Sequence, residues 1–181
     1  MSIPYRELRV DRDGSVARLT MNRPEKRNAL SARLVGELIA ALREANADRG
    51  ARVVVLTGAG DRAVIGGADI AEMVALDPQT AKTFITGLHD VCASIRNAPV
   101  PVIGRIQGYC LGGGLEVAAA CDMRVATDDA QFGMPEVRVG IPSVVEAALL
   151  PTLIGWGKTR ELLFTGTTID AAEALAYGLV E

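Results

Sequence analysis

The segment Gly108–Asp122, GYCLGGGLEVAAACD, constrains the fold more than any other part of the chain. Three consecutive glycines at 112–114 leave the backbone without side chains, so it can adopt dihedrals closed to other residues and a ligand can approach it closely. The run VAAAC after them is typical of a short buried helix, which puts the glycines at or before its N-terminus. Free N–H groups at such an end can hold an anion, or an oxygen that becomes negative during a reaction. The alternative is a tight turn that packs a helix closely on a strand.

Apolar patterns divide the chain into alternating strands and helices. Two alternating segments, 6–10 and 15–21, flank Asp13-Gly14 and predict a β-hairpin. Further strands are predicted at 52–56, 102–106 and 123–126, with a short extended piece at 131–132. Helices are predicted at 31–46, at 70–76, from Asp77 to before Pro99, and at 115–121, 143–154, 158–164 and 171–177. The alternation favours an α/β fold, and because no linker or repeat divides residues 1–181, we interpret them as one domain.

Composition narrows the functional classes. The net charge is −3 without a basic tract, which argues against a nucleic-acid-binding surface. Apolar stretches are interrupted before they reach membrane-spanning length, and the first 14 residues show no signal-peptide core. The three cysteines lack metal-like spacing and fit a reducing compartment. We therefore expect a cytoplasmic protein without a nucleic-acid or membrane partner, whose apolar fraction of 49% leaves surface for contacts with other subunits.

The sequence holds one histidine, His89, in the middle of a predicted amphipathic helix. A multi-histidine metal site is therefore impossible, and we predict no metal. A serine or cysteine nucleophile would depend on that single imidazole, and the chain has no G-x-S-x-G motif. We interpret His89 as an ordinary helix residue and Cys110, beside the glycines, as a small core residue.

The loop Gly58–Ala63 fits the dinucleotide-binding pattern G-x-G-x-x-A directly after an apolar strand. That pattern needs a helix that continues from its third small residue, whereas Gly66-Gly67 interrupt the chain three positions later. The loop also does not lie at the first strand–helix turn of the chain. A dinucleotide enzyme is therefore a rival hypothesis with an unfavourable sequence context.

Two glycine-led helix starts each follow a strand: Gly66-Gly67-Ala68-Asp69 and Gly112-Gly113-Gly114-Leu115-Glu116. Main-chain N–H groups from two such loops can form an oxyanion hole, in which each donor lowers a barrier by roughly 3–4 kcal/mol. Two carboxylates lie near, Glu116 and Glu136, and such a pair is natural acid–base equipment for a chain so poor in histidine. The alternative for Glu136 is a solvated loop residue. Burying a charged side chain such as Glu116 at an apolar helix start costs free energy, which favours a functional role for it.

These residues belong to a longer series of motifs: NRPEKRNALS, GGADIAEM, IQGYCLGGGLEVAAACDMRVA, QFGMPEVRVGIP and ELLFTG…AAEALAYGLV. With this series, in order and over essentially all 181 residues, the chain resembles the crotonase, or enoyl-CoA hydratase/isomerase, superfamily. The resemblance implies an α/β spiral of ββα units and an acyl-CoA thioester as substrate. It implies no separate cofactor, because CoA enters as part of the substrate.

By the resemblance, the main-chain N–H groups of Ala68 and Gly113 form the oxyanion hole for the thioester carbonyl and stabilise an enolate. Glu116 and Glu136 match the two glutamates of the hydratase members. Glu136 would supply the proton to the α-carbon, while Glu116 would hold and activate the water that adds at the β-carbon. Isomerases usually keep only the equivalent of Glu136, so the pair favours an enoyl-CoA hydratase. An isomerase or thioester hydrolase of the same superfamily and a non-catalytic acyl-CoA-binding module are the alternatives.

The resemblance also implies which residues hold the substrate. The loop that contains Lys26, Arg27 and Ala29 matches the part of the family that binds the nucleotide end of CoA, largely through its backbone, with basic residues near the phosphates. The acyl-pantetheine channel and its reactive end are expected along the two glycine-led segments, at Ala68, Asp69, Ile70, Ala71, Gly112 and Gly113.

Two features depart from the family pattern. After its Gly-Ile/Phe-Pro the family usually has a glycine-rich stretch, but this chain has Pro142-Ser143-Val144-Val145-Glu146, a bulkier wall with an extra carboxylate. The difference predicts a changed substrate shape or thioester hydrolysis; alternatively, Glu146 is simply a polar residue of the helix 143–154. Family chains also continue past the position of Glu181 into C-terminal helices that cover the acyl pocket and build trimers and hexamers. By the resemblance we expect a homo-oligomer. Because this sequence lacks that segment, the resemblance does not fix whether it is a trimer or a hexamer.

Overall fold

Two β-sheets form the frame of the protein, which a computed structural model describes for residues 5–181. The larger sheet has five strands in the order β1-β2-β3-β5-β7. β1 and β2 pair antiparallel, which confirms the hairpin predicted around Gly14, and the other pairs are parallel. The bounds of these strands are Leu8–Asp13, Val16–Met21, Val53–Gly58, Val102–Ile106 and Met123–Ala126.

The smaller sheet has four short strands in the order β4-β6-β8-β9. β4, β6 and β8 run parallel and β9 pairs antiparallel with β8. Their bounds are Ala63–Ile65, Tyr109–Leu111, Gln131–Gly133 and Thr168–Asp170. β4, β6 and β9 were not predicted as strands, and β8 coincides with the expected extended piece.

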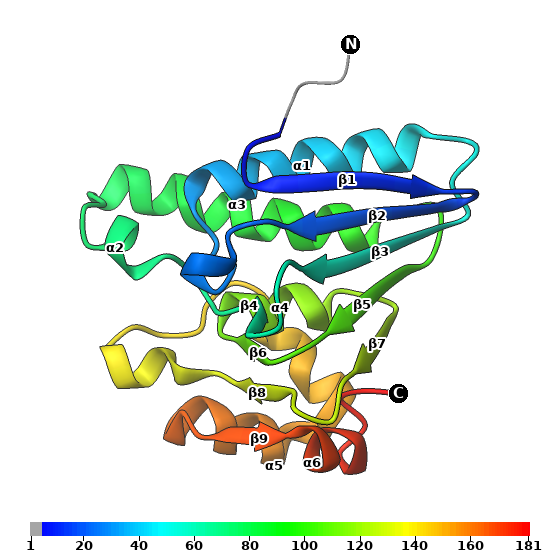
Figure 1. The fold of residues 1–181 in the computed structure, drawn as a ribbon. Helices are drawn as coiled ribbons and strands as arrows, with labels where there is room; N and C mark the ends of the chain where they lie inside the picture. Colours follow the sequence, from blue (N-terminus) through cyan, green and yellow to red (C-terminus); the bar gives the residue numbers. More distant parts are fainter. Residues whose placement is uncertain (1–4) are drawn as a thin grey trace.

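The chain passes repeatedly from the larger sheet to the smaller sheet and then into a helix. β3 leads to β4 and then to α2 and α3, β5 leads to β6 and α4, and β7 leads to β8 and the 3₁₀ turn η2 (Pro135–Val139). Figure 1 shows these passages descending through the molecule along the chain. The order confirms the predicted spiral of ββα units.

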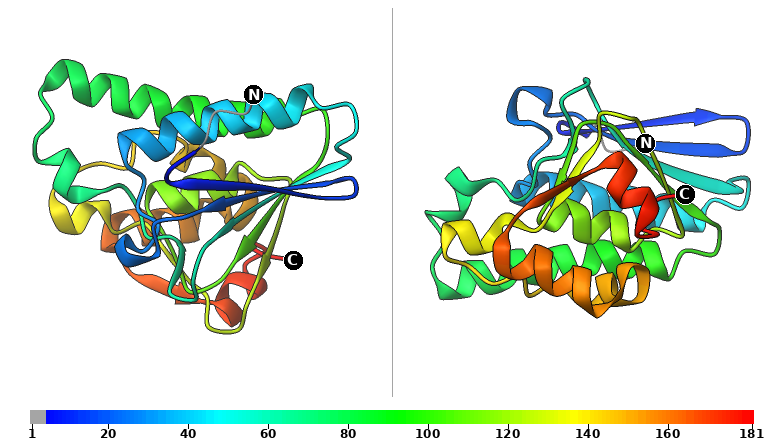
Figure 2. Two further views of the ribbon diagram at one scale, coloured as in Figure 1. Left: turned by 45° about the horizontal axis from the view of Figure 1, so that its top comes forward. Right: turned by 90° about the horizontal axis from the view of Figure 1, so that it is seen from below.

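The two long helices, α1 (Ala32–Ala47) and α3 (Pro78–Arg96), pack against each other beside the larger sheet, as both views in Figure 2 show. Both begin at predicted caps: Ser31 accepts a hydrogen bond from the Leu34 N–H, and Asp77 forms a capping box with Thr80. Their inner faces are buried as the apolar spacing predicts, and each fully buried leucine stabilises the fold by about 1.5–3 kcal/mol. The buried residues are Leu34, Val35, Leu38, Ala41, Leu42 and Ala45 of α1 and Phe84, Leu88, Val91, Cys92 and Ile95 of α3.

The short helix α4 (Gly113–Ala119) begins two residues before its predicted start, so two of the three glycines lie within its first turn. It contacts β4, β6, α3 and α5. A Cβ atom on Gly114 would lie 2.5 Å from the carbonyl oxygen of Ile65 in β4. The interpretation of a glycine that permits close helix–strand packing therefore holds at this position.

The prediction of a helix at 143–154 is wrong in its first half. Residues 143–146 form no helix, a 3₁₀ turn (η3) covers Ala147–Leu149, and α5 runs over Leu150–Thr165 with a break at Gly155, where φ is 72°. The main-chain N–H groups of Glu146 and Ala147 bind the carboxylate of Glu116 instead of opening a helix. Glu146 is therefore not the exposed polar residue of a helix.

Two further helices have the expected positions. α2 (Ile70–Met73) is shorter than predicted, and α6 (Ala171–Ala176) begins with the predicted capping box of Asp170 and Glu173. None of the helices formed by residues 5–181 combines the length and the apolarity that a membrane crossing requires.

Candidate active site

A pocket of about 310 Å³ lies between α3, the start of α4 and the segment that follows η2. Ala68, Gly113, Glu116 and Glu136 all line it, although they come from three separate parts of the sequence. Apart from these two carboxylates and Ser143, the side chains that line it are apolar: Met73, Leu76, Ala81, Phe84, Ile85, Leu88, Ile141, Pro142, Val144 and Val145. A second hollow of about 310 Å³ shares Ala68, Gly113 and Glu136 with it and extends along Gly66, Gly67, Ile70 and Gly112.

Two main-chain N–H groups of residues that line this pocket have no hydrogen-bond partner among residues 5–181. Gly113 is the first residue of α4, so its N–H has no partner within the helix. Ala68 lies in a parallel bridge with Leu30, in which the neighbouring residues make the hydrogen bonds. Within the described part of the chain, neither the Ala68 N–H nor the Gly113 N–H donates to another group. Both donors are therefore available to a ligand oxygen.

Glu116 is buried, with 3% of its surface exposed, in the first turn of α4. Its Oε1 accepts hydrogen bonds from the N–H groups of Glu146 at 3.0 Å and Ala147 at 2.9 Å. Burial raises the pKa of Glu116 from 4.5 to about 7, the two N–H groups act against the rise, and the Glu136 carboxylate adds to it. A carboxyl group with such a pKa can exchange a proton near neutral pH.

Glu136 lies in η2, and a glycine makes room for its carboxylate. A Cβ atom on Gly112 would lie 2.8 Å from Glu136 Oε1, and one on the next residue, Gly113, would lie 4.0 Å from Glu116 Oε2. The adjacent glycines thus face the two carboxylates. Among residues 5–181, the buried Oε2 of Glu136 has no hydrogen-bond partner, so it is an acceptor available to water or substrate.

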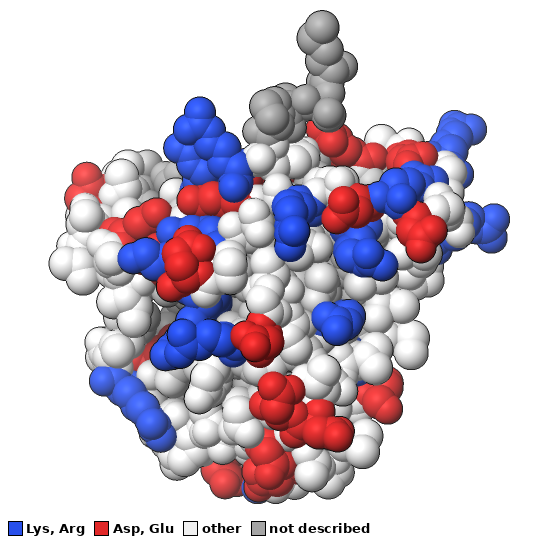
Figure 3. All heavy atoms as spheres, viewed as in Figure 1, with Lys and Arg blue, Asp and Glu red and all other residues white. Residues whose placement is uncertain are grey.

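The predicted CoA loop lies directly beside the first glycine segment. The Arg27 carbonyl accepts from the Gly66 N–H at 2.9 Å, and the Leu30 N–H donates to the Gly67 carbonyl at 2.8 Å. Lys26 and Arg27 are exposed, and Figure 3 shows basic side chains interspersed with acidic ones on this face of the molecule. The Ala29 carbonyl accepts from Arg23 at 2.6 Å. The structure therefore brings the two predicted substrate-binding segments together.

Asn28 shapes this loop, and no sequence motif pointed to it. Asn28 is fully buried and has a positive φ of 53°, and its side chain donates to the carbonyls of Ala59 and Ala63 at 2.9 and 2.8 Å. Its Oδ1 accepts from the Arg23 N–H at 2.8 Å. An asparagine is among the few residues that tolerate this backbone conformation, which is the only local signal that could have identified it.

Three other residues predicted to bind the substrate, Asp69, Ile70 and Ala71, lie at the start of α2. Ile70 and Ala71 are exposed in α2. The Asp69 side chain pairs with Arg23 at 2.9 Å and caps α2 through the Ala71 N–H, so only its main chain remains for a substrate. Contact of these three residues with a ligand stays a prediction.

The dinucleotide hypothesis does not fit the loop 58–63. Ala63 begins the strand β4 instead of a helix, so no helix N-terminus faces a phosphate. A Cβ atom on Gly58 would lie 2.6 Å from Asn28 Nδ2, and the Gln107 side chain donates to the Gly58 carbonyl at 2.6 Å. Protein groups therefore fill the space that a pyrophosphate would need.

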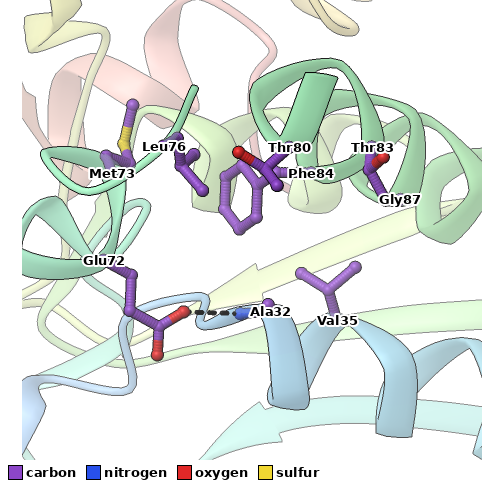
Figure 4. Close-up of a pocket in the computed structure, with 9 residues that line it drawn as sticks. All are labelled: Ala32, Val35, Glu72, Met73, Leu76, Thr80, Thr83, Phe84 and Gly87. Atoms are coloured by element: carbon purple, nitrogen blue, oxygen red, sulfur yellow. Dashed lines mark hydrogen bonds between the residues drawn. The ribbon is translucent and has the colours of Figure 1, made fainter. Parts of the chain in front are cut away.

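A separate apolar cavity of about 380 Å³ lies between α1, α2 and α3. Figure 4 shows the Phe84 ring in it and the Glu72 carboxylate bonded to the Ala32 N–H. It shares the side chains of Met73, Leu76 and Phe84 with the pocket described above but contains neither Glu116 nor Glu136. The described residues also form no cluster of three or more His, Cys, Asp or Glu side chains suited to a metal ion.

The fold and the pocket define an α/β protein of the ββα-spiral class with a pair of glutamates beside two free main-chain donors. The chain belongs to the enoyl-CoA hydratase/isomerase family, whose model matches residues 11–181. It is 38% identical over 172 residues to a short-chain-enoyl-CoA hydratase of Clostridium acetobutylicum, covering 94% of this chain and 66% of that protein. It is 37% identical over 177 residues to a crotonyl-CoA hydratase of Syntrophomonas wolfei, covering 97% and 68%.

Solved structures agree with this assignment. The crystal structure of an enoyl-CoA hydratase from Bacillus anthracis superposes with a TM-score of 0.93 at 36% identity, covering 97% of this chain and 69% of that one. The chain spans about two thirds of the length of the curated relatives that it matches.

Proposed function

We propose that this protein is an enoyl-CoA hydratase that adds water across the trans-2 double bond of an enoyl-CoA thioester. The observation that carries the proposal is that Glu116 and Glu136 line one pocket with Ala68 and Gly113. Relatives named as enoyl-CoA and crotonyl-CoA hydratases support the reaction class.

In the proposed mechanism, the thioester oxygen accepts hydrogen bonds from the N–H groups of Ala68 and Gly113. Conjugation carries the negative charge to this oxygen when a nucleophile adds to the β-carbon, so the two donors bind the transition state more tightly than the substrate. Donors of this kind each lower the barrier by roughly 3–4 kcal/mol.

The two carboxyl groups handle the water. The ionised Glu116 accepts a proton as the water oxygen bonds to the β-carbon, and Glu136 gives a proton to the α-carbon of the enolate. The double bond is lost, one hydroxyl and one hydrogen are gained, and the proton on Glu116 then restores Glu136 through exchange with water. Because burial raises the pKa of Glu116 to about 7, the rate should rise with pH until Glu116 is ionised.

The test is loss of the conjugated thioester absorbance of crotonyl-CoA with the wild-type chain, Glu116→Gln and Glu136→Gln. We expect each variant to lose roughly 10²-fold or more of kcat. Glu161→Gln is the matched control, because that glutamate is exposed and pairs only with Lys158 in the described structure. If both pocket variants keep the wild-type rate, the mechanism is wrong.

Product mass distinguishes the alternatives. Hydration adds one water to the thioester, isomerisation leaves the mass unchanged, and thioester hydrolysis releases free CoA. A non-catalytic acyl-CoA-binding module would show binding in calorimetry without turnover of any of these thioesters.

A further inference from the structure

His89 and Glu146 form a hydrogen-bonded pair, and Glu146 directly follows Val145 of the pocket lining. His89 lies in the middle of α3, and its Nδ1 is 2.7 Å from Oε1 of Glu146. The Glu146 side chain is 10% exposed, whereas that of His89 is 58% exposed. A carboxylate only accepts hydrogen bonds, so Nδ1 carries the proton. The histidine interpreted from the sequence as an ordinary helix residue thus has a specific partner.

The same Glu146 orients Glu116 through its main chain. The Glu146 N–H donates to Glu116 Oε1 at 3.0 Å, and the N–H of the next residue, Ala147, donates to the same oxygen at 2.9 Å. A continuous series of contacts therefore runs from the His89 ring through the Glu146 carboxylate and backbone to the Glu116 carboxylate.

The pair also anchors a segment that has few other attachments. The Ile141 N–H bonds to the Glu136 carbonyl, but within the described chain Pro142–Val144 make no hydrogen bond to another residue. Val144 and Val145 line the pocket. The side chain of Glu146 is therefore the tie between this irregular wall and the rigid helix α3.

We propose that His89 and Glu146 are positioning residues, whose hydrogen bond holds the 142–147 segment so that its N–H groups orient the Glu116 carboxylate for proton transfer. The inference rests on the proposed hydratase function for its effect on rate. Its effect on Glu116 itself does not depend on that function.

The proposal predicts the direction in which the titration of Glu116 moves when the pair is broken. Hydrogen bonds from main-chain N–H groups favour the ionised form of a carboxyl group. Loss of these donors removes a contribution that favours the ionised form, so the titration of Glu116 moves to higher pH and the acidic limb of the rate profile moves with it. Displacement of a catalytic group by a fraction of an ångström to 1 Å lowers kcat by about tenfold or more.

Other titratable groups surround this series of contacts. Glu136 from η2 interacts with Glu116, and Cys92 from α3 interacts with both Glu116 and Glu146. Burial raises the pKa of the Cys92 thiol, so it stays neutral, and Arg96 of the same helix lies near it. Replacement of Glu146 by alanine also removes a negative charge near Glu116, which by itself would move the Glu116 titration to lower pH. A shift to higher pH can therefore be assigned to the lost donors.

The experiment compares His89→Ala and Glu146→Ala with two conservative variants. In His89→Asn the side-chain amide nitrogen takes the place of Nδ1, and in Glu146→Gln an oxygen remains to accept from His89. Asp90→Ala is the matched control, because it is an exposed neighbour on the same helix. His89 is exposed enough that its replacement leaves the core intact, which circular dichroism verifies.

Two measurements are made on the full chain: kcat and KM for crotonyl-CoA across pH, and the titration of the Glu116 carboxyl carbon by ¹³C NMR. We expect the alanine variants to lose about tenfold or more of kcat with KM within about twofold, to titrate Glu116 at higher pH, and to recover in the conservative variants. Unchanged rates and an unchanged Glu116 titration would overturn the proposal, as would lower rates without a titration shift. A wild-type chain that does not hydrate any enoyl-CoA overturns the proposed function, and the NMR titration then still decides the positioning role.

Discussion

Replacement of Gly112 by alanine should show how the geometry of the pocket affects activity, apart from its effect on the stability of the fold. Gly112 has φ 54° and ψ −126°, a conformation that alanine adopts only at a cost of about 1–3 kcal/mol. The added Cβ would also lie 2.8 Å from Glu136 Oε1, below the ordinary contact distance of 3.4 Å, so this oxygen must move by about 0.6 Å. Such a displacement is expected to lower kcat for crotonyl-CoA by roughly 10–100-fold.

Gly14→Ala provides the control for the backbone cost. Gly14 has a similar φ of 55°, but nothing lies within 4 Å of its Cβ position. Urea denaturation should show comparable losses of unfolding free energy in the two variants, and the crotonyl-CoA assay should show a loss of rate only in Gly112→Ala. Equal rates in Gly112→Ala and Gly14→Ala would refute the argument that Gly112 exists to admit the Glu136 carboxylate.

Three further predictions follow from the described contacts. The pKa of Glu116 is about 7 in the folded protein, whereas the ordinary value of a glutamate is 4.5. The contribution of Glu116 to stability is therefore complete below pH 4.5 and decreases by roughly 3 kcal/mol as the pH rises through 7. Glu116→Gln should gain unfolding free energy relative to wild type between pH 4.5 and about 8, and a difference in urea denaturation that stays constant with pH would contradict the burial argument. Gly113→Pro removes the N–H at a helix position where proline is accepted, so kcat should fall by roughly 10²–10³-fold while Gly113→Ala, which keeps the N–H, retains activity. Asn28→Ala leaves two buried carbonyls without their donor and should lower the unfolding free energy by about 2–4 kcal/mol. The loss should be smaller in Asn28→Gly, because glycine adopts the positive φ of this position without strain.

The elements predicted well from the sequence carry their own local signals. The hairpin has its turn at Asp13-Gly14, and α1 and α3 begin at the caps Ser31 and Asp77, each with a side chain that accepts a main-chain N–H. Such signals depend on neighbours a few residues away, so they are readable without the tertiary structure.

The elements that were missed depend on distant partners. β4 and β6 are three residues long, and their residues pair only across the smaller sheet, so no periodicity could develop within them. Residues 143–146 have an apolar pattern compatible with a helix, but the hydrogen bonds from Glu146 and Ala147 to Glu116, 30 and 31 residues earlier, hold them in an irregular conformation.

The candidate site shows the same division. The glycine segments and the two glutamates were recognisable as motifs, and the structure places Ala68, Gly113, Glu116 and Glu136 in one pocket. The pairing of His89 with Glu146 joins residues 57 positions apart, and neither residue has a neighbouring motif that indicates the other. Resemblance identified the residues that match the family pattern and marked Glu146 as a departure from it. The contacts of Glu146 with His89 and Glu116 became visible only in the three-dimensional structure.

The central claim is that the two main-chain donors and the two glutamates act on one thioester. Its most direct test is a crystal structure of the chain with acetoacetyl-CoA, an unreactive analogue of the substrate. We expect the thioester oxygen to lie about 3 Å from both the Ala68 and the Gly113 nitrogens, with Glu116 and Glu136 on either side of the β-carbon. An analogue whose thioester oxygen contacts neither nitrogen would contradict the account.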